Sequence, residues 1–343
     1  MKEKVLLGMS GGLDSTYAVI DLRARGYEVE GAVLRMSAET DIEHARETAR
    51  TLGVPLHVVD CTERFREIVI ADFLHEYASA RTPNPCVICN RYVKIESLCE
   101  CARSLGIARV ATGHYADIGV GEDGRYYVRS AKDVKKDQSY VLWRLTQEQL
   151  SMLTFPLAGR EKREVRETAK ELMLPNADAS ESQEICFIPT DDYVSYVEEA
   201  LGKFPEGDFV DEHGAVVGRH RGIIHYTIGQ RKGLGLSMGR PVFVSEIDPA
   251  RGTVTVADEP AIFRTRLVCD TLNFQKLAPT PCGTVRATGR IRYGARPVPV
   301  TVTFDGERAE AVFDTPVRAV TPGQSVVFYD GDDVLFGGII VRN

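Results

Sequence analysis

The sequence has no run of about 18 consecutive apolar residues, the length that a membrane-spanning helix requires. Its N-terminal residues, MKEKVLLGMSGG, also lack the apolar segment and the small-residue cleavage site of a secretory signal peptide. We therefore expect a cytoplasmic protein that does not associate with membranes. Internal repeats and low-complexity tracts are absent too. A content of 43% hydrophobic and 27% charged residues excludes a disordered chain, a coiled coil and a collagen-like repeat.

An excess of positive charge is also missing, since the net charge is −7 at pH 7. Phosphate contacts require Lys and Arg, so this total argues against a nucleic-acid-binding protein. The charge is unevenly distributed, however: residues 201–343 carry 17 Lys and Arg against 16 Asp and Glu. Two stretches there, 213–245 and 271–304, contain basic and aromatic residues but no acid. They suit phosphate contacts and base stacking, although an ordinary solvated surface has the same composition.

The first half of the chain alternates between the two periodicities of secondary structure. Short apolar runs predict strands, and amphipathic segments that end at Gly26 and Gly53 predict helices. Thr40 to Glu43 fits a capping box that opens one of these helices. The expected strands are 4–9, 27–36, 55–60 and 110–114, and the expected helices are 15–25, 42–52, 63–78 and 90–105. Such alternation predicts an α/β domain around a parallel sheet, with ligands at the carboxyl ends of the strands.

The pattern changes along the second half. Residues 140–200 are mostly helical in pattern, for example 160–173, whereas short alternating runs separated by turn signals follow after about residue 203. Such runs are typical of small barrels or sandwiches. These patterns divide the chain into an α/β part with a helical extension at 1–202 and two β-rich parts at 203–267 and 268–343, each of which could be a small barrel or a sandwich.

The segment from Gly8 to Ser15, GMSGGLDS, connects a predicted strand to a predicted helix. Consecutive glycines let backbone N–H groups converge, and the start of a helix adds positive potential, so the segment suits an anion. Asp14 could hold Mg²⁺ or orient the loop. The loop has no Lys, which excludes a Walker A site. An ordinary glycine-rich turn remains the alternative for the glycines alone, but SGGxDS resembles the PP-loop of enzymes that cleave ATP to AMP and pyrophosphate.

Eight cysteines are present, and in a reducing compartment they are more often catalytic, metal-binding or buried than paired in disulfides. In the segment TPNPCVICN, two prolines precede Cys86 and Cys89, which places both at the start of a helix. The helix dipole there is expected to lower the pKa of the thiols. The CxxC alone fits metal ligands, a redox pair or buried small residues. A zinc site that adds Cys99 and Cys101 is disfavoured, because these two lie on different faces of one helix.

Seven motifs in this order resemble the bacterial tRNA-specific 2-thiouridylases of the MnmA type. They are GMSGGLDS, TPNPCVICNRYVK, ATGHYA, KKDQSY, SQEICFIP, HYTIGQRKGLG and RIRYGA, and they span nearly the whole chain. The resemblance implies a PP-loop α/β domain, a central β domain and a C-terminal barrel that binds tRNA. It also implies ATP-dependent formation of 2-thiouridine at the wobble position of tRNAs for Lys, Glu and Gln.

The resemblance assigns roles to individual positions. Cys89 corresponds to the nucleophile and Cys186 to the cysteine that carries a persulfide. The positions that correspond to ATP contacts are Gly8, Met9, Ser10, Gly11, Gly12, Leu13, Asp14, Ser15, Leu34 and Gly113. The positions that correspond to contacts with the target base or the tRNA are Asn84, Pro85, Cys86, His114, Lys136, Asp137, Gln138, Arg292, Tyr293 and Gln324. A cysteine desulfurase or a sulfur-relay protein is the implied sulfur donor.

Cys86 is a departure, because many members of the family have Asp there as a general acid or base. A thiol is a poorer proton shuttle, so that role is not transferred. With Cys86, the chain has three cysteines, Cys86, Cys89 and Cys186, that could hold a 4Fe–4S cluster with one iron left open for sulfide. A persulfide relay is the equal alternative, and a Cys89–Cys186 disulfide is expected in an oxidised sample without the cluster.

Two other functions fit parts of the sequence. One is a PP-loop ligase that adenylates a small molecule, against which the chain offers no glutaminase-like nucleophile segment. The other is an RNA-binding or metal-storage protein without catalytic activity, against which the intact SGGxDS loop argues.

Overall fold

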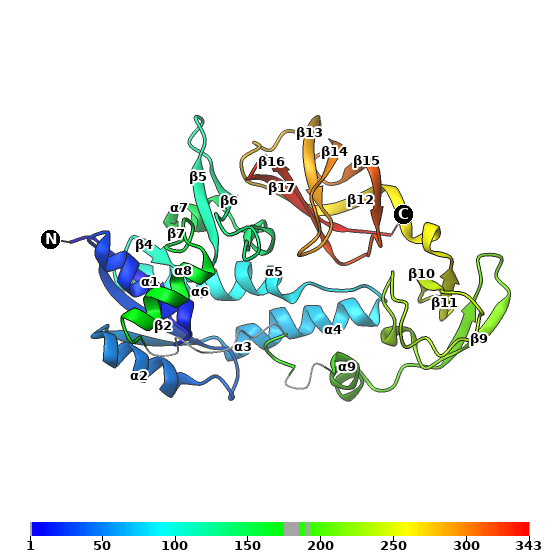
Figure 1. Ribbon diagram of the computed structural model, residues 1–343, viewed down its shortest axis with the longest axis horizontal. Helices are drawn as coiled ribbons and strands as arrows, with labels where there is room; N and C mark the ends of the chain where they lie inside the picture. The colour runs from blue at the N-terminus through cyan, green and yellow to red at the C-terminus, as the bar shows by residue number, and fades with distance from the viewer. Residues whose placement is uncertain (1, 175–184, 189–191, 343) are drawn as a thin grey trace.

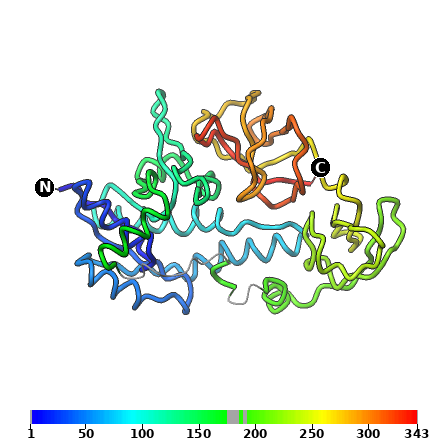
Figure 2. Tube along the Cα trace, in the orientation of Figure 1, coloured from blue at the N-terminus to red at the C-terminus, as the bar shows by residue number. Residues whose placement is uncertain are grey.

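A computed structural model describes residues 2–174, 185–188 and 192–342. The N-terminal α/β domain lies at one end of the molecule and a small β domain at the other, and a β-barrel lies above the helices that connect them (Figure 1). The chain runs out to the small β domain before it returns to the barrel (Figure 2). Three sheets therefore follow one another in the order that the sequence predicts.

The N-terminal sheet is parallel throughout, with the strand order β3-β2-β1-β4-β7. Its first strand is buried along Val5, Leu6 and Leu7, as expected for a strand with helices on both faces. The strands are β1 (Lys4–Gly8), β2 (Glu28–Arg35), β3 (Leu56–Asp60), β4 (Arg109–Ala111) and β7 (Leu153–Thr154). The predicted α/β class is confirmed. The fifth strand, β7, was not predicted, because two residues carry no periodicity.

The helices of this domain begin and end close to the predicted limits. Gly26 and Gly53 both have positive φ and follow the last turn of a helix. The prediction of a capping box that starts at Thr40 is wrong. Asp41 is the N-cap of α2 (Ile42–Leu52), and its carboxylate accepts a hydrogen bond from the His44 N–H at 2.9 Å. The helices are α1 (Leu13–Ala24), α2 (Ile42–Leu52), α7 (Gln147–Met152), α8 (Lys162–Glu171) and α9 (Tyr193–Leu201).

Two longer helices each contain a π-helical segment. The first comprises α3 (Thr62–Phe65), η1 (Arg66–Ile70) and α4 (Ala71–Ala78), and the second comprises α5 (Pro85–Cys89), η2 (Asn90–Lys94) and α6 (Ile95–Ser104). Segment η1 packs against α5, which carries the CxxC motif. Short π-helical segments are frequent at functional sites, and here both lie around the same pair of cysteines.

The small β domain is a four-stranded sheet with the order β10-β11-β8-β9. Its strands are β8 (Gly207–Val210), β9 (Val216–His220), β10 (Phe243–Asp248) and β11 (Thr253–Ala257). Its core is continuous with that of the helices, because Phe73 and Tyr77 of α4 and Val197 of α9 share one apolar cluster with Phe209. The helix α4 therefore connects this sheet to the N-terminal domain.

The C-terminal barrel is closed by the pairing of β12 with β17. Its strands are β12 (Phe263–Phe274), β13 (Gly283–Arg290), β14 (Val298–Phe304), β15 (Ala309–Arg318), β16 (Ser325–Asp330) and β17 (Asp333–Ile340). Strand β12 begins before residue 268 and so runs across the predicted domain boundary. A hairpin of the N-terminal domain, β5 (Ala116–Val120) and β6 (Tyr126–Ser130), extends this sheet beside β17.

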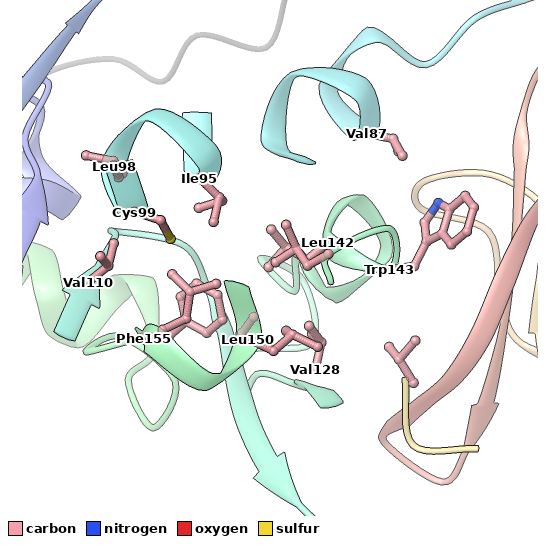
Figure 3. Close-up of a cluster of buried hydrophobic side chains, with 14 of the residues drawn as sticks. Val87, Ile95, Leu98, Cys99, Val110, Val128, Leu142, Trp143, Leu150 and Phe155 are labelled. Atoms are coloured by element: carbon pink, nitrogen blue, oxygen red, sulfur yellow. The ribbon is translucent and has the colours of Figure 1, made fainter. Parts of the chain in front are cut away.

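The barrel and the N-terminal domain share one hydrophobic core. Val87 of α5, Trp143 and Leu142 belong to the same buried cluster as Tyr329 and Val334 of the barrel. Figure 3 shows Val87 and Trp143 in this cluster, with Cys99 turned into it. The Trp143 indole N–H donates to Ser325 Oγ at 3.0 Å, so the polar atom of the buried ring is satisfied.

A buried ion pair crosses the same contact. Arg290 of β13 donates to Asp137 Oδ2 at 2.8 Å, and the Asp137 side chain is only 1% exposed. The carboxylate also accepts from the backbone N–H groups of Ala131 and Ser139 and from the Ser139 hydroxyl. Asp137 therefore holds a turn of the N-terminal domain against the barrel.

No helix in the described part of the chain is both long and apolar enough to cross a membrane.

Replacing Arg290 with Leu is expected to lower the free energy of unfolding by about 3 kcal/mol, because it leaves the buried Asp137 carboxylate without its cation. The matched control is Arg286→Leu. Arg286 lies on the same strand as Arg290, and its substitution removes an exposed ion pair with Asp314 of β15. Urea unfolding followed by tryptophan fluorescence measures both, since Trp143 lies at the contact. Equal midpoints for the two variants would contradict the role given to Asp137.

Candidate active site

The loop after β1 is built as the glycine-rich motif predicts. Gly11 has a φ of 82°, and Gly12 caps α1 with extended backbone. The Ser15 hydroxyl donates to the Gly12 carbonyl at 2.9 Å, and Ser10 Oγ accepts from the Gly12 N–H at 3.4 Å. Met9 is buried, and its N–H donates to the Ala32 carbonyl at 2.8 Å. Neighbouring strands and its own side chains thus hold the loop at the carboxyl end of β1.

Other elements close around this loop. A Cβ atom on Gly113, which follows β4, would lie 3.2 Å from the Asp14 Cβ, so the backbone after β4 touches the start of α1. A Cβ atom on Gly11 would lie 2.6 Å from His44 Cδ2 of α2. Leu34, at the end of β2, packs against the cluster that contains Cys89. The predicted ATP positions are therefore brought to one edge of the sheet, beside the CxxC helix.

A cation that the sequence analysis missed lies at the loop. The Lys162 ammonium donates to Asp14 Oδ1 at 2.6 Å and to Oδ2 at 2.7 Å, and the Tyr115 hydroxyl donates to Oδ1 at 3.1 Å. The Lys162 side chain is 10% exposed. Lys162 comes from the first turn of α8, and its separation from Asp14 along the chain explains why no local motif revealed it.

The CxxC motif begins a helix, as predicted. Asn84 is the N-cap and Pro85 occupies the first turn of α5. Cys86 is exposed, whereas Cys89 is 6% exposed and packs with Cys61, Phe65 and other apolar side chains of the two π-containing helices. The two thiols therefore have different environments: one faces solvent and the other lies in an apolar cluster.

The expectation that the helix dipole lowers the pKa of these thiols is wrong. Burial raises the pKa of Cys89 to about 11, and the nearby Lys94 ammonium offsets this effect only in part. The surrounding chain also desolvates the Cys86 thiol enough to raise its pKa, although the residue reaches the surface. Desolvation of a thiolate outweighs the dipole here because the helix start lies against an apolar cluster.

Cys186 lies near the CxxC motif. The side chain is exposed, and the next residue, Phe187, packs its ring against Phe65 at 5.6 Å and Phe73 at 5.2 Å between centroids. Thiolate charge on Cys186 acts on both Cys86 and Cys89. The packing of Phe187 thus holds residues 185–188 next to the CxxC helix. Residues 182–184 and Pro189 of the SQEICFIP motif lie outside the described residues.

The three cysteines do not form a metal site in this arrangement. Within 2–174, 185–188 and 192–342, no group of three or more His, Cys, Asp and Glu side chains could hold a metal ion. All eight cysteines are free, including Cys89 and Cys186. Cys99 of α6 is fully buried in the core, and Cys101 of the same helix packs against this core cluster. Both are therefore packing residues, as expected.

Comparisons with known proteins cover the whole chain. Residues 3–190 match the family described as tRNA methyl transferase HUP domain, 194–258 its PRC-barrel domain, and 264–340 the aminomethyltransferase beta-barrel domain. The "tRNA-specific 2-thiouridylase MnmA" of Clostridium perfringens is 43% identical, with 99% of this chain and 98% of that protein covered. The protein of the same name from Geotalea uraniireducens is 44% identical, with 99% and 95% covered.

The chain belongs to the tRNA-specific 2-thiouridylase family. Among solved structures, a 4-thiouridine synthetase in complex with RNA and ATP matches with a TM-score of 0.37 and 20% identity, over 57% of this chain and 50% of that one.

In this thiouridylase chain, the positions with a predicted tRNA role fall into two groups. Arg292 and Tyr293 are exposed on the barrel, and the Tyr293 ring lies 6.2 Å from that of Tyr140. Lys136 is half-buried, and Gln138 accepts from the Tyr115 N–H at 2.9 Å. Asp137 is buried at the barrel contact described above. Arg292 and Tyr293 thus lie at the surface of the barrel, whereas Asp137 and Gln138 are engaged within the protein.

His114 directly follows Gly113, whose backbone touches the start of α1. Its Nδ1 lies 2.7 Å from the Thr112 hydroxyl, and Lys94 acts on it as it acts on the thiols. Burial and this cation lower the pKa of His114 to about 3, so the imidazole is neutral at pH 7. The positive charge of the Lys94 ammonium therefore lowers the pKa of Cys86, Cys89 and His114 alike. The spacing of these residues in the sequence did not indicate this role.

Tertiary contacts also change the predicted basic surface of the thiouridylase. Arg286 pairs with Asp314, Arg290 with Asp137, and Lys276 with Asp330 and Asp333. In the described chain, the remaining basic residues of the two acid-free stretches that lack a carboxylate within 4.0 Å are exposed. They are Arg221, Arg231, Lys232, Arg292 and Arg296.

We expect Cys89 to react with iodoacetamide roughly 100-fold more slowly in the folded protein than in the unfolded protein at about pH 8, because a thiol with a pKa near 11 contains that much less thiolate. Peptide mapping by mass spectrometry measures the rate at this one residue. The rate in the folded protein should still rise between about pH 8 and pH 10. A plateau below pH 9 would contradict the raised pKa.

Proposed function

We propose that this protein is an ATP-dependent sulfurtransferase that converts the wobble uridine of tRNAs for Lys, Glu and Gln to 2-thiouridine, releasing AMP and pyrophosphate. The observation that carries the proposal is the position of the Cys89 thiol: Leu34, near the carboxyl end of β2, packs against the cluster that contains it, at the same edge of the parallel sheet as the loop of Gly8 to Ser15. Full-length similarity to proteins named tRNA-specific 2-thiouridylases supports it.

ATP is proposed to bind with its phosphates over the loop that starts at Gly8. Backbone N–H groups and the start of α1 provide positive potential there. Mg²⁺ usually takes one or two carboxylates together with phosphates and water, and Asp14 is a carboxylate in that place. Because Lys162 now occupies both Asp14 oxygens, the metal would replace the ammonium, which could then pair with phosphate. Mg²⁺ would neutralise the charge of the leaving pyrophosphate.

Activation of the base comes first. The uridine is turned out of its stack towards Asn84, Pro85 and Cys86, because its C2 oxygen must reach the α-phosphorus. That oxygen forms a bond to phosphorus, and pyrophosphate leaves with the electrons of the broken P–O bond. The C2 carbon now carries an adenylate, which is a good leaving group.

Sulfur transfer follows at the cysteines. The Cys89 sulfur attacks the inner sulfur of a persulfide on Cys186, which forms a Cys89–Cys186 disulfide and expels hydrogen sulfide. The hydrogen sulfide attacks C2 of the adenylated base and AMP leaves, so the C2 oxygen departs on the phosphate. A dithiol reductant must reopen the disulfide before the next turnover, and a cysteine desulfurase or sulfur-relay protein must restore the persulfide.

The exposure of Cys186 is consistent with sulfur delivery by a second protein. We place the reaction in the cytoplasm, where tRNA, ATP and reduced thiols occur together. An iron–sulfur cluster on Cys86, Cys89 and Cys186 is the alternative sulfur carrier. The thiolate ligands are chemically suitable, but the three thiols are not grouped as metal ligands among the described residues.

Cys186→Ser and Cys89→Ser should each abolish 2-thiouridine formation while pyrophosphate is still released in the presence of tRNA, since adenylation of the base requires neither thiol. Thiolated tRNA is measured on a mercury-containing gel, and pyrophosphate by a coupled assay. Cys99→Ser, in the packing core, is the matched cysteine control and should retain thiolation if it folds. Full thiolation by Cys186→Ser would refute the persulfide route, and pyrophosphate release without tRNA would indicate a small-molecule ligase.

Protein purified without oxygen should be colourless, free of iron and fully active with a persulfide donor. Visible absorption and iron and sulfide analysis measure the cluster content, and the thiolation rate is measured on the same samples. If the rate instead rises in proportion to bound iron, and Cys86→Ser loses both iron and activity, the cluster is the sulfur carrier.

A further inference from the structure

Tyr115, which comes shortly after β4, joins the turn at Gln138 to the ATP loop. Its N–H donates to Gln138 Oε1 at 2.9 Å, and its carbonyl accepts from the Gln138 N–H at 2.8 Å. The side chain is 3% exposed and lies in an apolar cluster with Leu157 and Val165. Both the backbone and the ring of Tyr115 are therefore fixed by their surroundings.

The hydroxyl of this fixed ring reaches the ATP loop. It donates to Asp14 Oδ1 at 3.1 Å, on the carboxylate whose two oxygens also accept from the Lys162 ammonium at 2.6 and 2.7 Å. The ammonium lies 5.7 Å from the centroid of the Tyr115 ring, within the range of a cation–π interaction. Tyr115 thus contacts both members of the ion pair, the anion through its hydroxyl and the cation through its ring.

The contact with Asp14 gains importance when the ion pair opens. While Lys162 pairs with Asp14, its two hydrogen bonds orient the carboxylate together with Tyr115. Once the ammonium turns to phosphate, as proposed above, the Tyr115 hydroxyl is the member of this trio that still orients Asp14. Mg²⁺ demands near-ideal octahedral geometry, so its affinity depends on how its carboxylate ligand is oriented. Loss of a hydrogen bond that orients a metal ligand typically weakens metal binding about 10- to 100-fold.

We propose that Tyr115 is a positioning residue for magnesium-dependent ATP binding: its hydroxyl holds the Asp14 carboxylate in the orientation that receives Mg²⁺ after Lys162 has turned to phosphate. The hydroxyl acts through Asp14 rather than on the reacting atoms. The inference rests on the proposed function. A tyrosine with a purely structural role would affect stability but not the dependence of ATP binding on Mg²⁺.

The test is Tyr115→Phe, which keeps the buried ring and its contact with Lys162 and removes only the hydroxyl. Calorimetry measures the binding of a non-cleavable ATP analogue, with a methylene bridge between the α- and β-phosphates, over a series of Mg²⁺ concentrations. The Mg²⁺ concentration that gives half-maximal binding should rise about tenfold or more. Tyr17→Phe is the matched control and should behave as the wild type, because Tyr17 belongs to the same apolar cluster but its ring lies under Arg160.

A double variant tests whether the hydroxyl acts through Asp14. Asp14→Asn alone should raise the half-maximal Mg²⁺ concentration, and adding Tyr115→Phe to it should raise that concentration by less than about twofold more. Pyrophosphate release in the presence of tRNA gives a second readout. Tyr115→Phe should be slow at low Mg²⁺ and should approach the wild-type rate at saturating Mg²⁺ and ATP.

An unchanged half-maximal Mg²⁺ concentration in Tyr115→Phe overturns the inference. So do additive effects in the double variant, which would show that the hydroxyl acts independently of Asp14. A loss of rate that saturating Mg²⁺ does not restore also overturns it, because the hydroxyl would then act in the chemical step. If the wild type binds the analogue with Mg²⁺ but forms no 2-thiouridine, the proposed function fails, while the binding data still decide the role of Tyr115.

Discussion

The buried contact between the barrel and the turn at Tyr140 to Trp143 is the constraint on which the site depends. The Trp143 N–H and the Tyr140 hydroxyl both donate to Ser325, and Gln275 of the barrel bonds the carbonyls of Leu142 and Trp143. Burial of apolar side chains stabilises the contact between the barrel and this turn. The polar pairs fix how the two align, because a shifted contact would leave several buried polar groups without hydrogen-bond partners. Ser325 directly follows Gln324, whose side-chain amide donates to two backbone carbonyls of the loop before the CxxC helix, so the alignment of the barrel also sets the position of that loop.

At the ATP loop of Gly8 to Ser15, the arrangement of the side chains depends on charge rather than on packing. A phosphate-binding loop without a basic residue needs its cation from elsewhere, and Lys162 supplies one from a helix far along the chain. While Lys162 neutralises Asp14, the loop has little net charge of its own. In the proposed mechanism, Mg²⁺ and ATP would bring opposite charges to the same two side chains, and the pair could exchange partners when both bind.

The sequence was sufficient for features that depend on local pattern. The strand–loop–helix at Gly8 to Ser15, the helix starting at Pro85 and the β-rich C-terminal part all follow from periodicity and turn residues. The family, and with it the C-terminal barrel, follows from motifs in order. What could not be predicted depends on contacts between distant residues. Asp137 and Gln324 are polar residues whose partners lie in another domain, and the pKa of Cys89 depends on a cluster drawn from two helices. Arg286 and Arg290 looked like a basic surface only because their partners, Asp314 and Asp137, are remote in sequence.

The raised pKa of Cys89 limits how the sulfur can be released. His114 has a pKa of about 3 and is too weak a base to remove a proton from a thiol with a pKa of about 11. In the proposed attack on a persulfide, the proton of Cys89 would instead leave on the expelled sulfur, which would depart as hydrogen sulfide. In that proposed step the buried thiol would require no general base, and the positive charge of Lys94, which acts on Cys89, would stabilise the negative charge that develops on the departing sulfur.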